Sequence, residues 1–162
     1  KPLGDKYGYN HVWNEGSGVA NSESIQFTWL DNRRFYTITS ATNKNDEIIF
    51  ARSGANDPKF NLRKDPSIII RKKNMQNTIY ASIIESHGTY DPVKEVASNA
   101  YSNFSKIEVL LDTEKYTAVK FYFNQQKEKT IILSNLNNEN NLQHSLNING
   151  KNYSWKGAYY YK

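Results

Sequence analysis

The chain has 162 residues, of which 38% are hydrophobic and 14% aromatic, enough to bury a core and to exclude wholesale disorder. It contains no Cys, which excludes disulfides, thiolate catalysis and Cys-based zinc sites. The net charge of +5 is a mild bias toward anionic partners such as nucleic acid or an acidic polysaccharide. No segment approaches the roughly 20 apolar residues that span a bilayer, so we expect no membrane span. Because the chain starts at Lys1, without Met, we expect a fragment or a processed chain.

The first half of the chain contains several strand patterns separated by turn residues. Residues 1–18 are rich in Gly and turn formers and predict a loop or an edge strand. Polar and apolar residues then alternate over 24–30 and 33–42, with a hairpin turn signal at Asp31-Asn32. Residues 46–54 predict a short apolar strand, and the two Pro of the next segment end it in a loop.

The rest of the chain continues the pattern. Two β-branched apolar runs, 67–73 and 77–88, predict strands with a polar turn between them. Residues 91–105 carry no strong pattern and predict a long loop. Further strands are predicted at 105–113, 116–123, 129–135, 144–148 and 152–157. Asn149-Gly150, between the last two, is the strongest hairpin signal in the chain.

These patterns amount to about ten short strands and no capped amphipathic helix. They predict an all-β fold, an antiparallel β-sandwich or a set of stacked sheets. We expect a single β domain over residues 1–162. The loop 91–105 is the candidate seam between 1–90 and 106–162.

One stretch, IYASIIESHGTYDP (79–92), gathers groups that could carry chemistry. Glu85 and His87 are two positions apart, so their side chains share one face of a strand. Such a pair could polarise the imidazole for base catalysis. It could equally be a hydrogen-bonded pair at a strand end, where Gly88 turns the chain, and spacing alone does not decide.

A second cluster of charged residues lies in RSGANDPKFNLRKDP (52–66). An Arg on a rigid loop, such as Arg52 or Arg63, can grip a carboxylate through two hydrogen bonds. The alternative is a structural loop in which Arg63 pairs with a nearby acid, Asp57 or Asp65.

Metal and nucleic-acid sites are not indicated. His11, His87 and His144 are the only three His and are far apart in sequence, so we predict no metal and no cofactor. The basic residues are scattered, and neither a glycine-rich phosphate loop nor an RNA-binding sheet motif is present, so we predict no nucleic-acid partner. The aromatic run Tyr159 to Tyr161 could stack a sugar ring or line a half-buried terminal strand.

Two segments carry a family resemblance. FARSGANDPKFNLRKDPSIIIR (50–71) and ASIIESHGTYDPVKE (81–95) resemble the C-terminal β region of heparinase II/III-like polysaccharide lyases, most closely the alginate lyase branch, polysaccharide lyase family 17. GYNHVW (8–13) and NGKNYSWKG (149–157) look like the start and end of the same region. The resemblance therefore covers most of the chain.

The resemblance implies a layout and an activity. These lyases cleave uronic-acid polysaccharides by β-elimination, with an N-terminal α/α toroid followed by stacked β-sheets. Their catalytic Asn, His and Tyr and their structural metal lie in the toroid and the earlier β region. As aligned, this chain begins after all of those positions, which lowers the expectation that His87 is a catalytic base.

We therefore expect a non-catalytic C-terminal β domain of a secreted or periplasmic lyase acting on an alginate-like polymer. Whether the chain is itself an enzyme stays open, and we expect the fragment alone to be inactive. Its expected partners are the acidic polysaccharide, the toroid and central β domain of the same protein, and a second copy of the chain. We predict no catalytic residue here, and the expected substrate contacts are Arg52, Arg63, His87 and Tyr90.

Two other functions are kept as alternatives. One is a stand-alone carbohydrate-binding β-sandwich, which would need an exposed aromatic platform such as Trp13, Trp29 or Trp155. The other is a self-sufficient hydrolase using Glu85 or Glu95 with an Asp, which needs two carboxylates at a set separation.

Overall fold

The computed structural model describes residues 1–54 and 65–162. These residues form thirteen strands and one 3₁₀ helix, η1 (Tyr9–His11), and all the strand pairs are antiparallel. The predicted all-β fold of stacked antiparallel sheets is confirmed. No helix in this described part is both long and apolar enough to cross a membrane.

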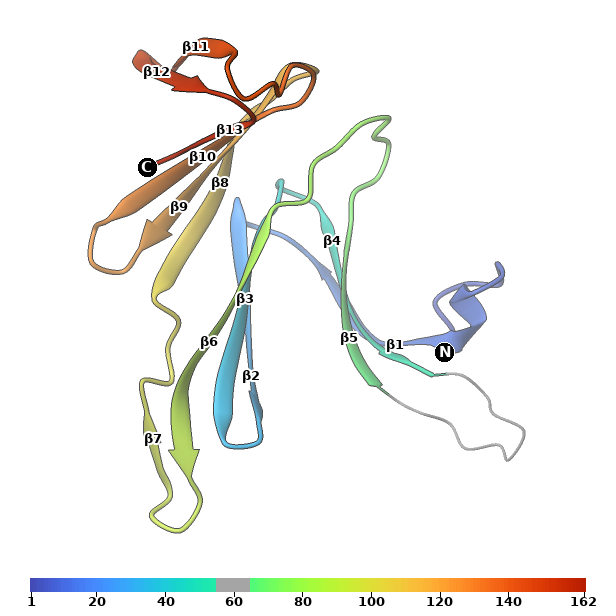
Figure 1. Cartoon of the computed structure of the whole chain (residues 1–162). Helices are drawn as coiled ribbons and strands as arrows, with labels where there is room; N and C mark the ends of the chain where they lie inside the picture. The colour runs from blue at the N-terminus through green and yellow to red at the C-terminus, as the bar shows by residue number, and fades with distance from the viewer. Residues whose placement is uncertain (55–64) are drawn as a thin grey trace. The chain divides into compact units, whose positions relative to one another are not determined.

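The chain divides into two units. Unit 1 comprises Lys1–Ser22 and Thr42–Asn77, and unit 2 comprises Glu23–Ala41 and Thr78–Lys162. The described part of unit 1 is a three-stranded sheet of β1 (Val12–Val19), β4 (Glu47–Ser53) and β5 (Asp65–Arg71), in the order β1-β4-β5 (Figure 1). The central strand β4 buries Ile48, Ile49 and Ala51, as expected of a β-branched apolar run with a neighbour on each side. The first segment of the chain thus supplies an edge strand.

The first sheet of unit 2 consists of β2 (Ser24–Asp31), β3 (Arg34–Ala41), β6 (Ser82–Asp91) and β7 (Val96–Ser98), in the order β2-β3-β6-β7. The β2–β3 turn residues are Asn32 and Arg33, with φ of 45° and 66°, one position later than predicted. Strand β6 begins at residue 82 rather than 77, and β7 lies within the predicted loop 91–105.

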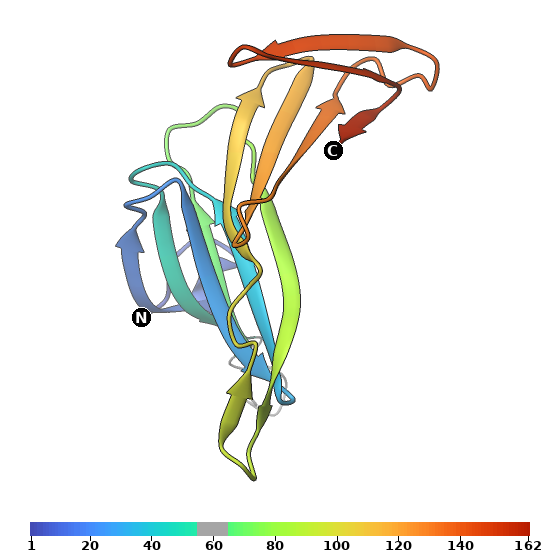
Figure 2. The same ribbon diagram turned by 90° about the vertical axis from the view of Figure 1, so that its left-hand side faces the viewer.

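The second sheet of unit 2 has the order β13-β10-β9-β8. Its strands are β8 (Phe104–Asp112), β9 (Tyr116–Phe123), β10 (Glu128–Ser134) and β13 (Tyr159–Tyr161). A hairpin of β11 (Gln143–Ile148) and β12 (Lys151–Lys156) lies across one end of this sheet (Figure 2). The predicted Asn149-Gly150 turn joins the hairpin, with φ of 51° and 84°, the left-handed values that a tight hairpin turn requires.

The core of unit 2 lies on both faces of this second sheet. On one face, Ala118 and Ile132 pack against Ile148, Tyr153 and Trp155 of the hairpin. On the other face, Ile107 and Val119 pack against Ala41, at the end of β3. Burying each such large apolar side chain contributes about 1.5–3 kcal/mol, so both faces stabilise the layered arrangement.

Candidate functional site

His87 is buried in β6 and bound at both ring nitrogens. Its side chain is 7% exposed, and its ring stacks on that of Phe35. Nδ1 lies 2.9 Å from the carbonyl oxygen of Asn99, and Nε2 lies 2.8 Å from Thr37 Oγ1. Because a carbonyl only accepts, Nδ1 donates its proton to Asn99, and Nε2 is hydrogen-bonded to the Thr37 hydroxyl. A free nitrogen for taking a substrate proton is therefore absent from this arrangement.

The hydrogen bonds of His87 extend into the sheet. Thr28 Oγ1 lies 2.7 Å from Thr37 Oγ1. The two threonine hydroxyls are therefore hydrogen-bonded to each other across β2 and β3. The chain of bonds joins β2, β3 and β6 and ends on the segment after β7. It therefore ties strands together in the sheet interior.

Glu85 shares the strand face of His87 but has separate partners. Its carboxylate accepts hydrogen bonds from the Ser102 hydroxyl and from the backbone and side-chain amides of Asn103. Burial by itself raises the pKa of Glu85, but these hydrogen bonds and the nearby His87 outweigh it, so the pKa is lowered. Glu85 is thus an ionised carboxylate that binds the segment before β8. It does not carry the proton that a general acid would donate to a leaving oxygen.

Gly88 is a bulge rather than the predicted turn. β6 continues through it to Asp91, and the pairing with β3 passes from Phe35↔His87 to Arg34↔Thr89, leaving Gly88 as the extra residue. Its φ is +53°, and an added Cβ would lie 2.2 Å from the carbonyl oxygen of Asn99. Both the backbone conformation and the close approach require glycine.

The four expected substrate contacts fall in different places. His87 and the half-buried Tyr90 lie on β6 of unit 2. Arg52 lies on β4 of unit 1, where its Nε is 3.0 Å from Glu15 Oε2, and both side chains are about half exposed, at 44% and 50%. Arg63, with its expected partner Asp57, lies outside the described residues.

A cleft of about 500 Å³ opens in unit 2 beside Glu85. It is lined by Glu85, Asn103, Phe104, Phe123, Asn124, Gln125, Lys127 and Lys129. The rings of Phe104 and Phe123 lie 4.6 Å apart between centroids, and both lysines are exposed. The sequence analysis counted these lysines among the scattered basic residues. The missed signal was their place at the start of β10, where Lys129 lies on the strand and Lys127 directly precedes it.

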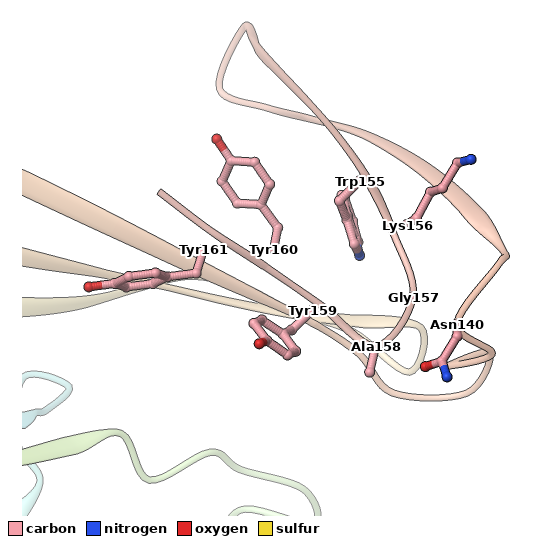
Figure 3. A pocket seen from close by; sticks show the side chains of 8 residues that line it. All are labelled: Asn140, Trp155, Lys156, Gly157, Ala158, Tyr159, Tyr160 and Tyr161. Atoms are coloured by element: carbon pink, nitrogen blue, oxygen red, sulfur yellow. The ribbon is translucent and has the colours of Figure 1, made fainter.

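A second hollow, of about 590 Å³, lies at the last strand. Figure 3 shows its lining residues, Asn140, Trp155, Lys156, Gly157, Ala158, Tyr159, Tyr160 and Tyr161. Trp155 is only 7% exposed, because it packs in the core beneath the hairpin. The expectation that Trp155 could serve as an exposed platform is therefore wrong, whereas Trp13 and Trp29 are 38% and 42% exposed.

Metal ligands are not grouped in the described ranges. Among residues 1–54 and 65–162, His, Asp and Glu form no cluster of three or more that could hold an ion. His144 instead stacks on Trp155 and lies with its Nδ1 3.1 Å from the Tyr116 hydroxyl. We therefore assign its imidazole to the aromatic core.

Two proteins that are named as alginate lyases are similar to the chain over nearly its whole length. It is 31% identical over 160 residues to an exo-oligoalginate lyase of Saccharophagus degradans, covering 97% of this chain and 22% of that enzyme. It is 29% identical over 158 residues to an alginate lyase of Stenotrophomonas maltophilia, covering 97% of this chain and 21% of that enzyme. The chain therefore spans about a fifth of the length of these relatives. No protein-family model matches it.

Proposed function

We propose that the chain is the non-catalytic C-terminal β domain of a heparinase II/III-like lyase that cleaves a uronate polysaccharide by β-elimination. One observation carries the proposal: 97% of the chain aligns with an exo-oligoalginate lyase but accounts for only 22% of that enzyme. Most of such an enzyme lies outside the aligned part, which leaves room for a separate catalytic region.

The bonding of the acid and base candidates supports a non-catalytic role. β-Elimination needs a base positioned to take the proton at C5 of the sugar and an acid for the leaving oxygen. Both nitrogens of the buried His87 are engaged by Thr37 and Asn99. Both oxygens of Glu85 are engaged by Ser102 and Asn103. In this arrangement neither group is available for proton transfer with a substrate.

The proposal includes partners and a compartment. The covalent neighbours would be an α/α toroid and a central β domain, and a second copy could pack on the chain. Arg52, Arg63 and Tyr90 are the proposed contacts to the polymer or to those neighbours. His87, bonded inside the sheet to Thr37 and Asn99, would contribute by holding the strand that carries Tyr90. Because polymeric uronates are outside the cell membrane, the protein would act in the periplasm or after secretion.

A comparison of the 162-residue chain with the same protein extended toward its N-terminus tests the proposal. Both are incubated with alginate, heparan-type and hyaluronan-type polymers, and the ultraviolet absorbance of the unsaturated uronate is followed. We expect product only from the protein extended toward its N-terminus. Product from the 162-residue chain alone would contradict the non-catalytic role and would return Glu85, His87 and Tyr90 to consideration as an active site.

The second candidate is a stand-alone carbohydrate-binding domain. The observation that favours it is the exposure of aromatic rings, with Trp13 and Trp29 38% and 42% exposed. Calorimetric titration of the chain with alginate, together with an elimination assay of the extended protein, distinguishes the lyase domain from the stand-alone binding domain. Affinity without elimination in any longer form would favour the stand-alone domain.

A further inference from the structure

Two tyrosines of the edge strand β13 have exposed side chains on one face of the second sheet of unit 2. Tyr159 pairs with Leu133 and Tyr161 with Ile131 across β13 and β10. Directly paired residues share a face, and Tyr159, Tyr161 and Leu133 are 62%, 58% and 42% exposed. Figure 3 shows Tyr159 and Tyr160 on opposite sides of β13. An apolar surface is thus exposed at the edge of the sheet.

Lys129 connects this surface to the cleft. Its Nζ lies 5.4 Å from the centroid of the Tyr161 ring, and the residue also lines the cleft together with Lys127 and Phe123. Lys129 pairs with Phe121 across β10 and β9, which places it on the same face as Tyr159 and Tyr161, by alternation along the strands. We call the set Tyr159, Tyr161, Lys129 and Lys127 the tyrosine–lysine strip.

The two lysines of the strip differ from their neighbours in pairing. Lys120 and Lys151 both lie within ion-pair distance of Glu128, and Lys106 pairs with Glu23 and Glu108. Within the part of the chain that the structure describes, Lys127 and Lys129 have no carboxylate partner. The one carboxylate of the cleft, Glu85, already accepts hydrogen bonds from Ser102 and Asn103. Two ammonium groups therefore remain for an external anion.

A ring face next to an unpaired ammonium suits one class of ligand. The apolar face of a pyranose ring packs on an aromatic ring, and its carboxylate pairs with an adjacent ammonium. The side-chain amides of Asn124 and Gln125, which line the same cleft, can donate to and accept from sugar hydroxyls. Successive same-face tyrosines about 7 Å apart along a strand offer rings to more than one sugar unit.

We propose that the tyrosine–lysine strip binds an oligosaccharide of uronic acids, with Tyr159 and Tyr161 stacking on the sugars and Lys127 and Lys129 pairing with their carboxylates. This inference rests on the proposed function and assigns to the domain a direct contact with the polymer. The contact would hold the polymer on the β domain while a catalytic region elsewhere cleaves it.

Calorimetric titration of the 162-residue chain with oligomers of mannuronate and of guluronate tests the proposal. Tyr159→Ala, Tyr161→Ala and Lys129→Gln are each expected to weaken binding about three- to tenfold. Matched controls are Tyr101→Ala, a change of another exposed tyrosine, and Lys94→Gln, a change of another exposed lysine. Both controls should leave the affinity unchanged. Circular dichroism confirms that each variant is folded.

The probe and the salt concentration make the assignment specific. Uronate binding should weaken as salt rises from about 50 mM to 500 mM, because the exposed pairs are screened, and an uncharged mannose oligomer should bind at least tenfold more weakly. Absence of uronate binding, equal binding of the uncharged oligomer, or affinity that is indifferent to all three strip variants would overturn the proposal. Such a result, combined with elimination by the extended protein, would leave the proposed function intact.

Discussion

His87 Nε2 and Thr37 Oγ1 lie 2.8 Å apart in the interior of the first sheet of unit 2. The bond crosses from β6 to β3, and the other ring nitrogen holds the carbonyl of Asn99. The spacing of Glu85 and His87 suggested a catalytic base. In the structure, the imidazole instead holds three segments of backbone together. Its contribution should appear in stability rather than in turnover.

His87→Ala is expected to lower the free energy of unfolding by on the order of 2 kcal/mol, because the Thr37 hydroxyl and the Asn99 carbonyl lose their buried partner. Urea denaturation followed by circular dichroism measures it. Thr37→Val, combined with His87→Ala in a double-mutant cycle, should give a coupling of about 0.5–1.5 kcal/mol. Ser86→Ala, at the exposed neighbouring position on β6, is the control and should stay within about 0.5 kcal/mol of the parent.

The same change also separates structure from catalysis. If the extended protein shows elimination, His87→Ala should preserve the rate per folded molecule. A variant that keeps its unfolding midpoint but loses elimination would show that the internal bonds of His87 open during turnover.

Gly88→Ala should lower the stability of the fold far more than the same change at Gly150, another glycine with positive φ. Gly88 has φ +53° and would place a Cβ 2.2 Å from the Asn99 carbonyl oxygen, whereas Gly150 has φ +84° with no atom within 4 Å. We expect Gly150→Ala to cost about 1 kcal/mol from conformation alone, and Gly88→Ala to cost more than about 2 kcal/mol because the backbones must also separate. Thermal unfolding of both variants provides the comparison. Equal losses of stability in the two variants would mean that the Asn99 backbone leaves room for a Cβ at position 88.

The sequence predicted those features that depend on neighbours in the chain. Asn149-Gly150 forms the hairpin turn because left-handed φ values are a local property of these two residues. Gly88 was expected to form a turn and instead forms a bulge, because the atoms that demand glycine there belong to Asn99. Strand alternation likewise predicted the burial of apolar runs, but not that β5 and β6, adjacent in sequence, would join different sheets.

The candidate site was harder to predict for the same reason. Trp155 is buried because the β11–β12 hairpin folds onto the second sheet, a contact that no local pattern encodes. The cleft lysines were visible as Lys-Glu-Lys beside a turn, a pattern typical of solvated charge. The two lysines become a candidate binding site only through the pairing of β13 with β10, which places Tyr161 on the same face as Lys129.

Glu85 should make the fold sensitive to acid. Although burial raises its pKa, hydrogen bonds from Ser102 and Asn103 leave it lowered overall. A carboxyl whose pKa is lower in the folded than in the unfolded chain stabilises the fold above the unfolded value of about 4.3, and that stabilisation is lost as pH falls through the folded value. Unfolding midpoints measured from pH 6 to pH 3 should therefore fall less steeply in Glu85→Gln than in the parent. Parallel curves for the two proteins would contradict this assignment.

Tyr122 should be among the last tyrosines to ionise. Burial, followed by the hydrogen bond to the ionised Glu108 and the charge of that group, raises its pKa to about 12; its hydroxyl oxygen lies 2.7 Å from Glu108 Oε2. The bond in turn is the main cause that lowers the pKa of Glu108. Since the neutral phenol is favoured in the fold, this contribution to stability is full below the unfolded value of about 10 and is lost as pH rises through 12.

Glu108→Gln tests this pairing, because it removes the charge and leaves the burial of the ring in place. The absorbance of ionised tyrosine is followed against pH in the unmutated chain, in Glu108→Gln and in Tyr122→Phe. The difference between the curves of the unmutated chain and Tyr122→Phe is the titration of Tyr122 alone. We expect the Tyr122 transition to move toward lower pH in Glu108→Gln without reaching its ordinary value, since burial still opposes ionisation. An unchanged transition would assign the whole shift to burial and would make the Glu108 bond incidental.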